Sequence, residues 1–303
     1  MNKGEQAGPT LRGRGASLNP RNRFESTVVE PDTGHGVGPE ISVKTRYIED
    51  PSRTIISRND SPDLGFNQSL NPYRGCEHGC SYCYARPTHE YLGYSAGVDF
   101  ETRIFYKPGA AELLEEALTR RNYRPETLVL SGVTDPYQPA ERRFRITRAC
   151  LHVLADYRHP VSIVTKNHAV VRDIDLLERL HADGCASVNL SVTSLDPHLA
   201  RRLEPRTSAP AERIEAVRRL AAAGIPAGVI LGPVIPGLNE TEMPAILEAA
   251  AEAGARWFRY SVIRLPGPVK NLFVDWLERH ESGKRDRVLD RIRHRLGRLR
   301  GRA

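Results

Sequence analysis

The run Asn71-Pro-Tyr-Arg-Gly-Cys-Glu-His-Gly-Cys-Ser-Tyr-Cys-Tyr-Ala85 holds three of the five cysteines of this 303-residue chain. Cys76, Cys80 and Cys83 are spaced C-x3-C-x2-C, and no nearby cysteine completes a set of four. Glycines inside the run supply the backbone freedom that a short loop needs to wrap thiolates around a metal centre. Three thiolates suit a [4Fe–4S] cluster that keeps one iron open for a small molecule. They also suit a structural zinc ion with His78 or His89 as the fourth ligand.

Outward from this run, apolar strands alternate with amphipathic helices along the chain. This order predicts βα crossovers and an α/β fold with a parallel sheet, which fits either an open doubly wound sheet or a partial barrel. The expected strands are 69–73, 128–130, 161–165, 186–192, 226–231 and 257–262. The expected helices are 109–122, 147–157, 170–182, 211–223, 241–253, 269–280 and 285–299.

Polar residues follow or occupy the ends of three expected strands. Active residues of parallel α/β folds gather at the carboxyl ends of strands, so these residues are candidates for one site. Lys166 follows the strand at 161–165, where it can pair with a carboxylate. Alternation places Asn189, Ser191 and Thr193 on one face, where they can bind a ribose or a carboxylate. The turn after 128–130 adds Ser131, Gly132, Thr134 and Asp135.

Other stretches leave alternatives open. Glu204-Pro-Arg206 can reach a ligand or form a structural ion pair. The stiff proline-rich loop after the fifth strand can lay the main chain of 233–235 along a bound ligand. Cys150 and Cys185 are isolated apolar thiols, and we expect both in the core.

The composition is that of a globular protein, and no stretch approaches the roughly 20 apolar residues of a membrane span. The first residues lack the apolar core of a secretory signal, and the cysteine pattern is not a disulfide framework. We therefore expect a cytoplasmic protein without a membrane partner. The reducing cytoplasm also suits an oxygen-sensitive cluster. Residues 1–45 are rich in Gly, Pro, Asn and charge, which predicts a mostly disordered arm. The expected core spans 46–265, and basic helices span 266–303.

The net charge of +7 is confined to one end of the chain. Residues 283–303 carry nine Lys or Arg against two Asp, an excess that equals the whole net charge. Only this tail therefore argues for a polyanionic partner such as nucleic acid, and its arginines can equally form a solvated helix face.

The cysteine spacing, with Tyr82 directly before the third cysteine, resembles the signature of the radical S-adenosylmethionine (SAM) superfamily. The resemblance implies a partial (βα)6 barrel, a [4Fe–4S] cluster on Cys76, Cys80 and Cys83, and SAM on the open iron with Tyr82 beside its adenine. It implies an enzyme that cleaves SAM reductively to a 5′-deoxyadenosyl radical, which takes a hydrogen from the substrate. It also implies an external one-electron reductant of the flavodoxin or ferredoxin type. The cofactor supplies this chemistry, and the protein supplies position and shielding.

Further motifs resemble the spore photolyase-like, DNA repair photolyase-related group of this superfamily. They are Ser-Gly-Val-Thr-Asp-Pro at 131–136, Thr-Lys-Asn at 165–167, Leu-Glu-Pro-Arg at 203–206 and Pro-Val-Ile-Pro-Gly-Leu-Asn at 233–239. By this resemblance Lys166 contacts the carboxylate of SAM, and Tyr82 and Tyr84 serve in radical transfer. The turn with Ser131, Gly132, Thr134 and Asp135 would contact the amino group of SAM.

One position departs from the group. Gly132 stands where spore photolyase carries its hydrogen-donor cysteine, so repair of the spore photoproduct by that route lacks its thiol here. The substrate is therefore not assigned by the sequence. An enzyme that acts on protein or on a small molecule stays open. So does a zinc-bound nucleic-acid-binding module without catalysis, although that module leaves Lys166 without a role. Metal content, iron with sulfide or zinc alone, separates the enzyme from the module.

Overall fold

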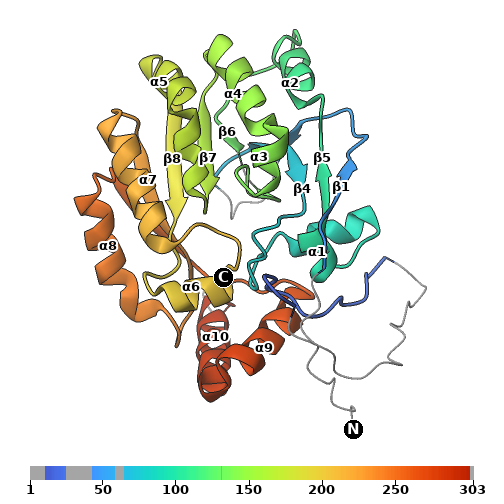
Figure 1. The fold of residues 1–303 in the computed structure, drawn as a ribbon, viewed down its shortest axis with the longest axis vertical. Coiled ribbons are helices and arrows are strands. Elements are labelled where there is room, and N and C mark those ends of the chain that lie inside the picture. The colour runs from blue at the N-terminus through green and yellow to red at the C-terminus, as the bar shows by residue number, and fades with distance from the viewer. Residues whose placement is uncertain (1–10, 25–42, 59–64, 131, 301–303) are drawn as a thin grey trace.

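The computed structural model describes residues 11–24, 43–58, 65–130 and 132–300, with side chains as far as residue 294. Its main element is a seven-stranded sheet of order β10-β9-β8-β7-β6-β3-β2, in which all neighbouring strands are parallel except β3 and β2, which are antiparallel (Figure 1). Among the described residues β10 and β2 are the two edges, which leaves the barrel open. This confirms the predicted α/β fold with a parallel sheet. The strands are β2 (Ile56–Arg58), β3 (Gln68–Leu70), β6 (Leu128–Leu130), β7 (Val161–Thr165), β8 (Ala186–Ser191), β9 (Ala227–Val234) and β10 (Trp257–Val262).

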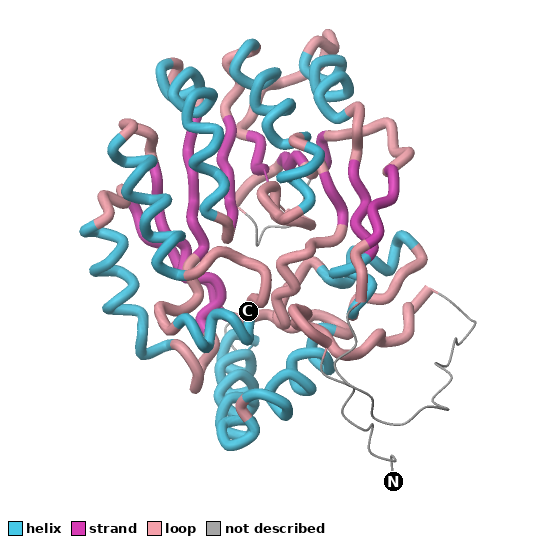
Figure 2. The backbone as a smooth tube through the Cα atoms, in the orientation of Figure 1, coloured by secondary structure: helices cyan, strands magenta, loops and turns pink. Residues whose placement is uncertain are grey.

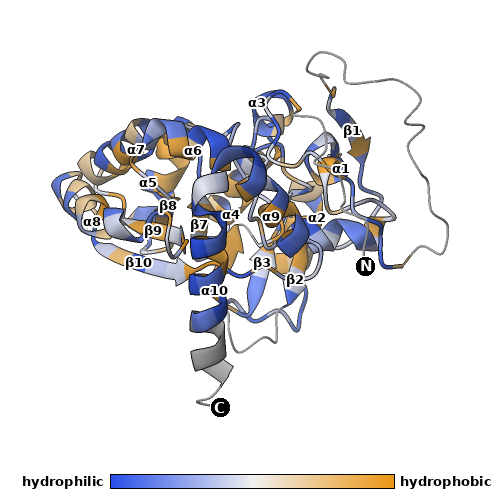
Figure 3. Ribbon diagram, turned by 90° about the horizontal axis from the view of Figure 1, so that it is seen from below, coloured by the Kyte–Doolittle hydropathy of each residue, from blue (hydrophilic) through white to orange (hydrophobic). Residues whose placement is uncertain are grey.

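Helices cover one face of this sheet (Figure 2), because the strands turn alternate apolar side chains towards them. Leu130, Ile163, Val188, Val229 and Leu231 share that face by register, and all five are fully buried. The opposite face carries polar residues such as Ser162, Ser187 and Asn189, and Figure 3 shows α5 and α7 together on one side of β8, β9 and β10. The covering helices are α2 (Ala110–Leu118), α4 (Ile146–Asp156), α5 (Ile174–Ala182), α7 (Pro210–Ala222) and α8 (Met243–Glu252).

The expected strand at 69–73 is split in two. β3 ends at Leu70, and Pro72, which has no N–H for a ladder, carries the chain into β4 (Tyr73–Arg74). β4 belongs to a second sheet of order β1-β5-β4, with β1 (Arg46–Glu49) and β5 (Arg103–Tyr106). The cysteine loop starts where β4 ends, so this small sheet fixes its position.

The predicted C-terminal helices are present as α9 (Val269–His280) and α10 (Arg285–Arg300), at the carboxyl end of the main sheet (Figure 1). Trp276 of α9 and Val288 of α10 are fully buried in one apolar cluster with Cys80 and Tyr82. The two helices therefore form part of the wall around the cysteine loop. No helix within the described ranges is both long and apolar enough to cross a membrane. Short helical segments are η1 (Arg86–Leu92), α1 (Val98–Thr102), α3 (Ala140–Phe144), η2 (His168–Asp173), α6 (Pro197–Leu203), η3 (Glu240–Glu242) and η4 (Ser282–Lys284).

Residues 11–24 are the main described part of the arm for which the composition predicts mostly disorder, and its parts at 1–10 and 25–42 lie outside the described residues. The main-chain N–H of Gly15 donates to the carboxylate of Glu101 at 3.1 Å, and Ser17 Oγ donates to Asp275 of α9 at 2.6 Å. Contacts with distant parts of the chain thus order this stretch, which we call the N-terminal segment.

Candidate functional site

The cysteine loop, residues 75–85, connects β4 to η1. Cys76 and Cys80 are buried, and Cys83 is half-buried. The N–H of Cys76 donates to the carbonyl of Phe100 at 2.9 Å, and the N–H of Cys83 donates to the carbonyl of Cys80 at 3.3 Å. The loop therefore winds tightly, with its first cysteine fixed to the neighbouring chain.

Two glycines make this winding possible. Gly75 and Gly79 have φ of +76° and +68°, in the left-handed region that favours glycine. A β-carbon on Gly75 would come within 2.9 Å of the carbonyl oxygen of Phe100, and one on Gly79 within 2.7 Å of the Glu101 carboxylate. Both positions thus require glycine for conformation and for space.

A buried ion pair supports the loop from below. Arg86 and Glu101 are both fully buried and lie 2.5 Å apart. Arg86 also donates to the carbonyl of Cys80 from Nε at 3.0 Å and from Nη2 at 2.8 Å. Because a guanidinium presents its donors in a rigid fork, this pair fixes the main chain at Cys80.

The turn after β6 holds the loop from the other side. Thr134 Oγ1 and Gln138 Nε2 both donate to the carbonyl of Gly75, at 2.6 and 3.1 Å. Gln138 Oε1 in turn accepts the N–H of Glu77 at 3.0 Å. Thr134, for which the sequence predicts a ligand contact, is thus hydrogen-bonded to the cysteine loop.

The thiol chemistry fits a metal cluster. Burial raises the pKa of Cys76, Cys80 and Cys83, so their thiolates need a nearby cation, which a metal centre supplies. Across the described ranges, no three Cys, His, Asp or Glu side chains converge closely enough to share one metal ion. Three thiolates on one loop suit a cluster, in which each thiolate binds its own iron.

Neither histidine considered as a fourth zinc ligand is placed for that role. His78 Nδ1 lies 3.3 Å from the Asp135 carboxylate, and its Nε2 lies 3.2 Å from Asn167 Nδ2, so both ring nitrogens are engaged. His89 is fully buried among the rings of Tyr94 and two phenylalanines, with centroid distances of 5.6 to 5.9 Å.

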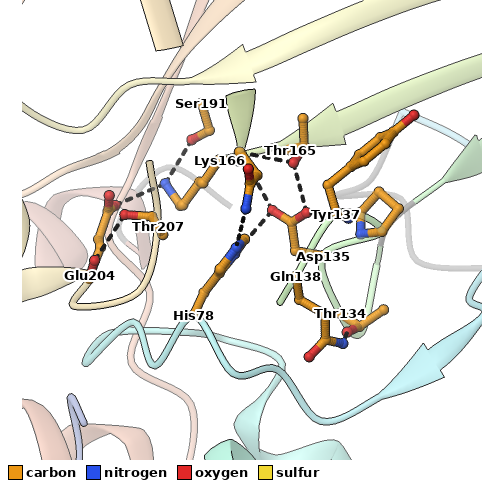
Figure 4. A network of polar contacts seen from close by, with 12 residues as sticks. His78, Thr134, Asp135, Tyr137, Gln138, Thr165, Lys166, Ser191, Glu204 and Thr207 are labelled. Atoms are coloured by element: carbon orange, nitrogen blue, oxygen red, sulfur yellow. Dashed lines mark hydrogen bonds and ion pairs between the residues drawn. The ribbon is translucent and has the colours of Figure 1, made fainter. Parts of the chain in front are cut away.

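Lys166 lies at the centre of a polar network at the carboxyl ends of the strands (Figure 4). Its Nζ donates to Ser191 Oγ at 2.8 Å, to Thr193 Oγ1 at 3.0 Å and to the carbonyl of Gly232 at 2.8 Å. It also pairs with the Glu204 carboxylate at 3.0 Å. The structure thus brings together Lys166, Ser191 and Thr193, as the strand-end pattern predicted.

Glu204 joins the lysine to the rest of the site. It is buried, and its other oxygen pairs with Arg213 of α7 at 2.6 Å. Burial alone would raise the pKa of Glu204, but Arg213 and Lys166 outweigh it and hold the pKa well below its usual range. Tyr82 donates its hydroxyl to the same carboxylate. The ionised Glu204 therefore connects the cysteine loop to Lys166.

Asp135 braces the same region (Figure 4). Its carboxylate accepts the N–H of Lys166 at 2.8 Å and the hydroxyl of Thr165 at 2.7 Å, and it lies beside His78. Burial opposes ionisation, but His78 and these hydrogen bonds lower the pKa of Asp135 overall. The sequence predicts a ligand contact for Asp135. In the structure its carboxylate joins the end of β7 to the cysteine loop.

The two tyrosines of the loop differ in their surroundings. Tyr82 is buried, and its ring lies 5.7 Å from Lys166 Nζ. Tyr84 has 57% of its side chain exposed, yet desolvation and the neighbouring Cys83 thiol raise its pKa to about 12. Tyr84 is therefore an exposed side chain next to Cys83 in the sequence.

The remaining residues singled out from the sequence lie outside the network around Lys166 or outside the described residues. Ser131 falls outside the described residues, and Gly132 adopts φ of +135°, a conformation that glycine permits. Asn189 is held within the sheet, because it accepts from Trp257 Nε1 at 2.8 Å. Cys150 is fully buried, as predicted, whereas Cys185 is only half-buried, because it ends a surface turn.

Sequence reasoning missed three supporting residues and left Glu204 and Arg206 undecided. Arg206 Nε donates to the carbonyl of Gly13 at 3.1 Å, so Arg206 contacts the N-terminal segment. Arg213 is spaced in the sequence so that it shares a helix face with the apolar residues of α7. This spacing could have predicted a buried arginine, which needs a buried carboxylate as its partner. Arg86 and Gln138 carried no such signal.

Asn239 fixes the loop at 233–235, since its Nδ2 donates to the carbonyl of Pro233 at 3.0 Å.

The chain is similar in sequence and fold to several known proteins. The model of the Radical SAM superfamily matches residues 70–250. An uncharacterized protein of Mycobacterium tuberculosis is 37% identical over 218 residues, which cover 71% of this chain and 64% of that protein. An uncharacterized protein of Methanocaldococcus jannaschii is 29% identical over 178 residues, 59% of this chain and 64% of that one. A structure of a spore photoproduct lyase variant with bound AdoMet and dinucleoside spore photoproduct aligns with a TM-score of 0.56 and 17% identity, over 78% of this chain and 66% of that one. At that identity the likeness extends to the fold alone.

Proposed function

Because the chain belongs to the Radical SAM superfamily, we propose that it is an enzyme that carries a [4Fe–4S] cluster on Cys76, Cys80 and Cys83 and binds SAM between the cysteine loop and Lys166. One observation carries this proposal: Tyr82, within the cysteine loop, shares the carboxylate of Glu204 with Lys166. When bound and reduced, the cluster would supply the electron that cleaves SAM to methionine and a 5′-deoxyadenosyl radical, which abstracts hydrogen from a substrate.

Lys166 would hold the carboxylate of SAM. An ammonium has three N–H donors, and Lys166 makes four contacts of 3.0 Å or less. One acceptor is therefore dispensable, and a ligand carboxylate can take its place. Ser191 and Thr193 would then bind the ligand or keep Lys166 aimed at it.

The turn after β6 would meet the amino group of SAM, with Ser131 and Gly132 as the contacts. Thr134 and Asp135 would position this turn, because their polar atoms are bonded to the cysteine loop and to β7. Tyr84 would pass a hydrogen atom or radical, since it is exposed beside Cys83.

We further propose a flavodoxin or ferredoxin type of reductant and a reducing, cytoplasmic setting, in keeping with five free cysteines. The nucleic-acid partner suggested by the basic tail gains no support from the described side chains. Lys284, Arg285 and Arg293 each pair with a carboxylate within 3.1 Å. Deleting 283–303 would also remove Val288 from the wall of the site. Replacing Arg293, Arg295 and Arg298 by Gln is therefore the cleaner test of salt-dependent binding.

The test of the proposed function is electron paramagnetic resonance of the anaerobically reconstituted, dithionite-reduced chain, with and without SAM. We expect a [4Fe–4S]⁺ signal that changes when SAM is added and that disappears in Cys83→Ala. Cys185→Ser, a half-buried cysteine outside the loop, is the matched control and should keep the signal. A chain that holds only zinc after careful reconstitution would overturn the proposal and favour the binding module.

A further inference from the structure

The face of the main sheet that turns away from the helices has its own pattern of side chains. Register places Ser162 beside Ser187, Asn189 beside Gly228, and Gly228 beside Trp257. Their neighbours on the other face are apolar and fully buried, for example Ile163 and Val188. A sheet face that turns away from the helices and carries hydroxyl and amide groups is suited to binding a polar molecule.

The polar groups of this face are already ordered. Ser187 Oγ donates to Ser162 Oγ at 3.0 Å, and Asn189 Nδ2 donates to Ser162 Oγ at 3.2 Å. Asn189 Oδ1 accepts from the indole N–H of Trp257 at 2.8 Å. The chain of bonds fixes the Trp257 ring over the sheet, so the ring is preorganised for a contact.

Trp257 fits there because residue 228 is glycine. A β-carbon on Gly228 would lie 2.0 Å from Nε1 and 2.3 Å from Cε2 of the indole, so the ring occupies the space of a missing side chain. Trp257 is nevertheless only half-buried. One side of the indole thus packs on the β9 backbone, and its remaining surface is open as a platform for a planar group.

Arg259 lies on the same face, two residues along β10. It is exposed, and it has no ion-pair partner among the described residues. Arg259 pairs in register with Ile230 of β9, and Ile230 pairs with Ser191 of β8. The hydroxyl of Ser191 accepts a hydrogen bond from Lys166. Neighbouring strands are about 4.8 Å apart, so the backbone at Arg259 lies roughly 10 Å from that at Ser191, at the level of the proposed SAM site.

We propose that this face is the substrate site and that the substrate joins a planar unsaturated ring to an anionic group. The ring would stack on Trp257 and the anionic group would bind Arg259, because side chains at i and i+2 of a strand share a face and stand roughly 7 Å apart. Charge supports the same occupant. Arg259 is a cation without an ion-pair partner among the described residues, whereas the carboxylate of Glu204 is already paired with Lys166 and Arg213. The inference rests on the proposed function for the reaction, but binding at this face needs no reduction of the cluster.

The test is fluorescence titration of the anaerobically reconstituted full chain with phenyl phosphate, and with phenol and inorganic phosphate as probes of each half alone. The chain has two tryptophans, and Trp276 is fully buried, so quenching by a bound ring reports on Trp257. We expect phenyl phosphate to bind at least tenfold more tightly than either half. Arg259→Gln should remove that advantage and leave phenol binding unchanged. Trp257→Leu should weaken the binding of phenyl phosphate and of phenol alike. Calorimetry measures the binding to this variant, because it lacks the reporting tryptophan.

Two controls make the outcome decisive. Arg256→Gln makes the same change at an exposed arginine just before β10 and should bind phenyl phosphate as the unmodified chain does. Equal binding by Arg259→Gln and the unmodified chain, equal losses in the two arginine variants, or no saturable quenching would each overturn the inference. A chain that binds phenyl phosphate as expected but shows no SAM-dependent resonance signal would refute the proposed function and leave the ring-and-anion site standing.

Discussion

Gly15 of the N-terminal segment lies directly against Gly79 of the cysteine loop: a β-carbon on Gly15 would come within 1.8 Å of the carbonyl oxygen of Gly79. The two stretches meet at this distance because residue 15 has no side chain. Glu101 binds them together, since its carboxylate accepts the N–H of Gly15 at 3.1 Å and pairs with Arg86 at 2.5 Å. The N-terminal segment therefore encloses one side of the proposed cluster.

Gly15→Ala should push the N-terminal segment away from the cysteine loop, because the added carbon has no room. We expect the reconstituted cluster to decay several-fold faster in air, measured by the loss of its visible absorbance. Gly65→Ala is the matched control, since nothing lies within 4 Å of a β-carbon at that position. Equal decay of both variants and the unmodified chain would show that the segment gives no protection.

Lys166→Gln should weaken SAM binding by about tenfold or more, equivalent to roughly 1.4 kcal/mol, because a neutral amide replaces the cation that faces the carboxylate. Equilibrium dialysis of labelled SAM against the reconstituted protein measures this affinity. Lys270→Gln, at an exposed lysine of α9, should bind SAM as the unmodified chain does. If Lys166→Gln keeps full affinity, the carboxylate of SAM binds elsewhere.

The parts of the site that could be predicted from sequence carry local signals. Cys76, Cys80 and Cys83 lie within eight residues of one another. A short apolar run indicates the strand that leads to Lys166. Pro72, which splits the expected strand at 69–73, is also a local signal, because it removes a ladder donor. Features of this kind depend only on residues that are close in the sequence, so they can be predicted without knowing how the chain folds.

The rest depended on contacts between distant residues. Glu204 pairs with Lys166 and accepts the hydroxyl of Tyr82, which is 122 residues away in the sequence, and nothing near Glu204 indicates these partners. The N-terminal segment has the composition of a disordered chain, yet bonds to Glu101 and Asp275 order it. Composition describes a segment alone, whereas its order here comes from partners elsewhere in the chain.

Glu204→Gln should destabilise the fold by roughly 3 kcal/mol, because removing one partner of a buried ion pair leaves the other charge buried without compensation. Here that charge is the fully buried Arg213. Urea unfolding measures the free-energy change. Glu215→Gln changes an exposed glutamate of the same helix as Arg213, where a surface pair contributes less than about 1 kcal/mol. Similar losses in the two variants would mean that the buried pair adds no more than a surface pair.

His89 should make the stability of the protein depend on pH. Both ring nitrogens are buried and have no hydrogen-bond partner in the described part of the chain, and burial lowers the pKa of His89 from 6.5 to about 4. The unfolded chain therefore binds this proton more readily, so the contribution of neutral His89 is complete above pH 6.5 and is lost as the pH falls towards 4. The loss amounts to roughly 3 kcal/mol.

His89→Phe should remove that dependence, because phenylalanine keeps an aromatic ring among Tyr94, Phe100 and Phe105 and binds no proton. At pH 7 we expect equal or higher stability, since no hydrogen bond is lost. The measurement is the free energy of unfolding in urea between pH 7 and pH 4, taken as the difference between the variant and the unmodified chain. His152→Gln, at an exposed histidine of α4, should keep the dependence of the unmodified chain. A pH profile that is the same with and without His89 would show that this histidine gains a proton or a partner in the folded state.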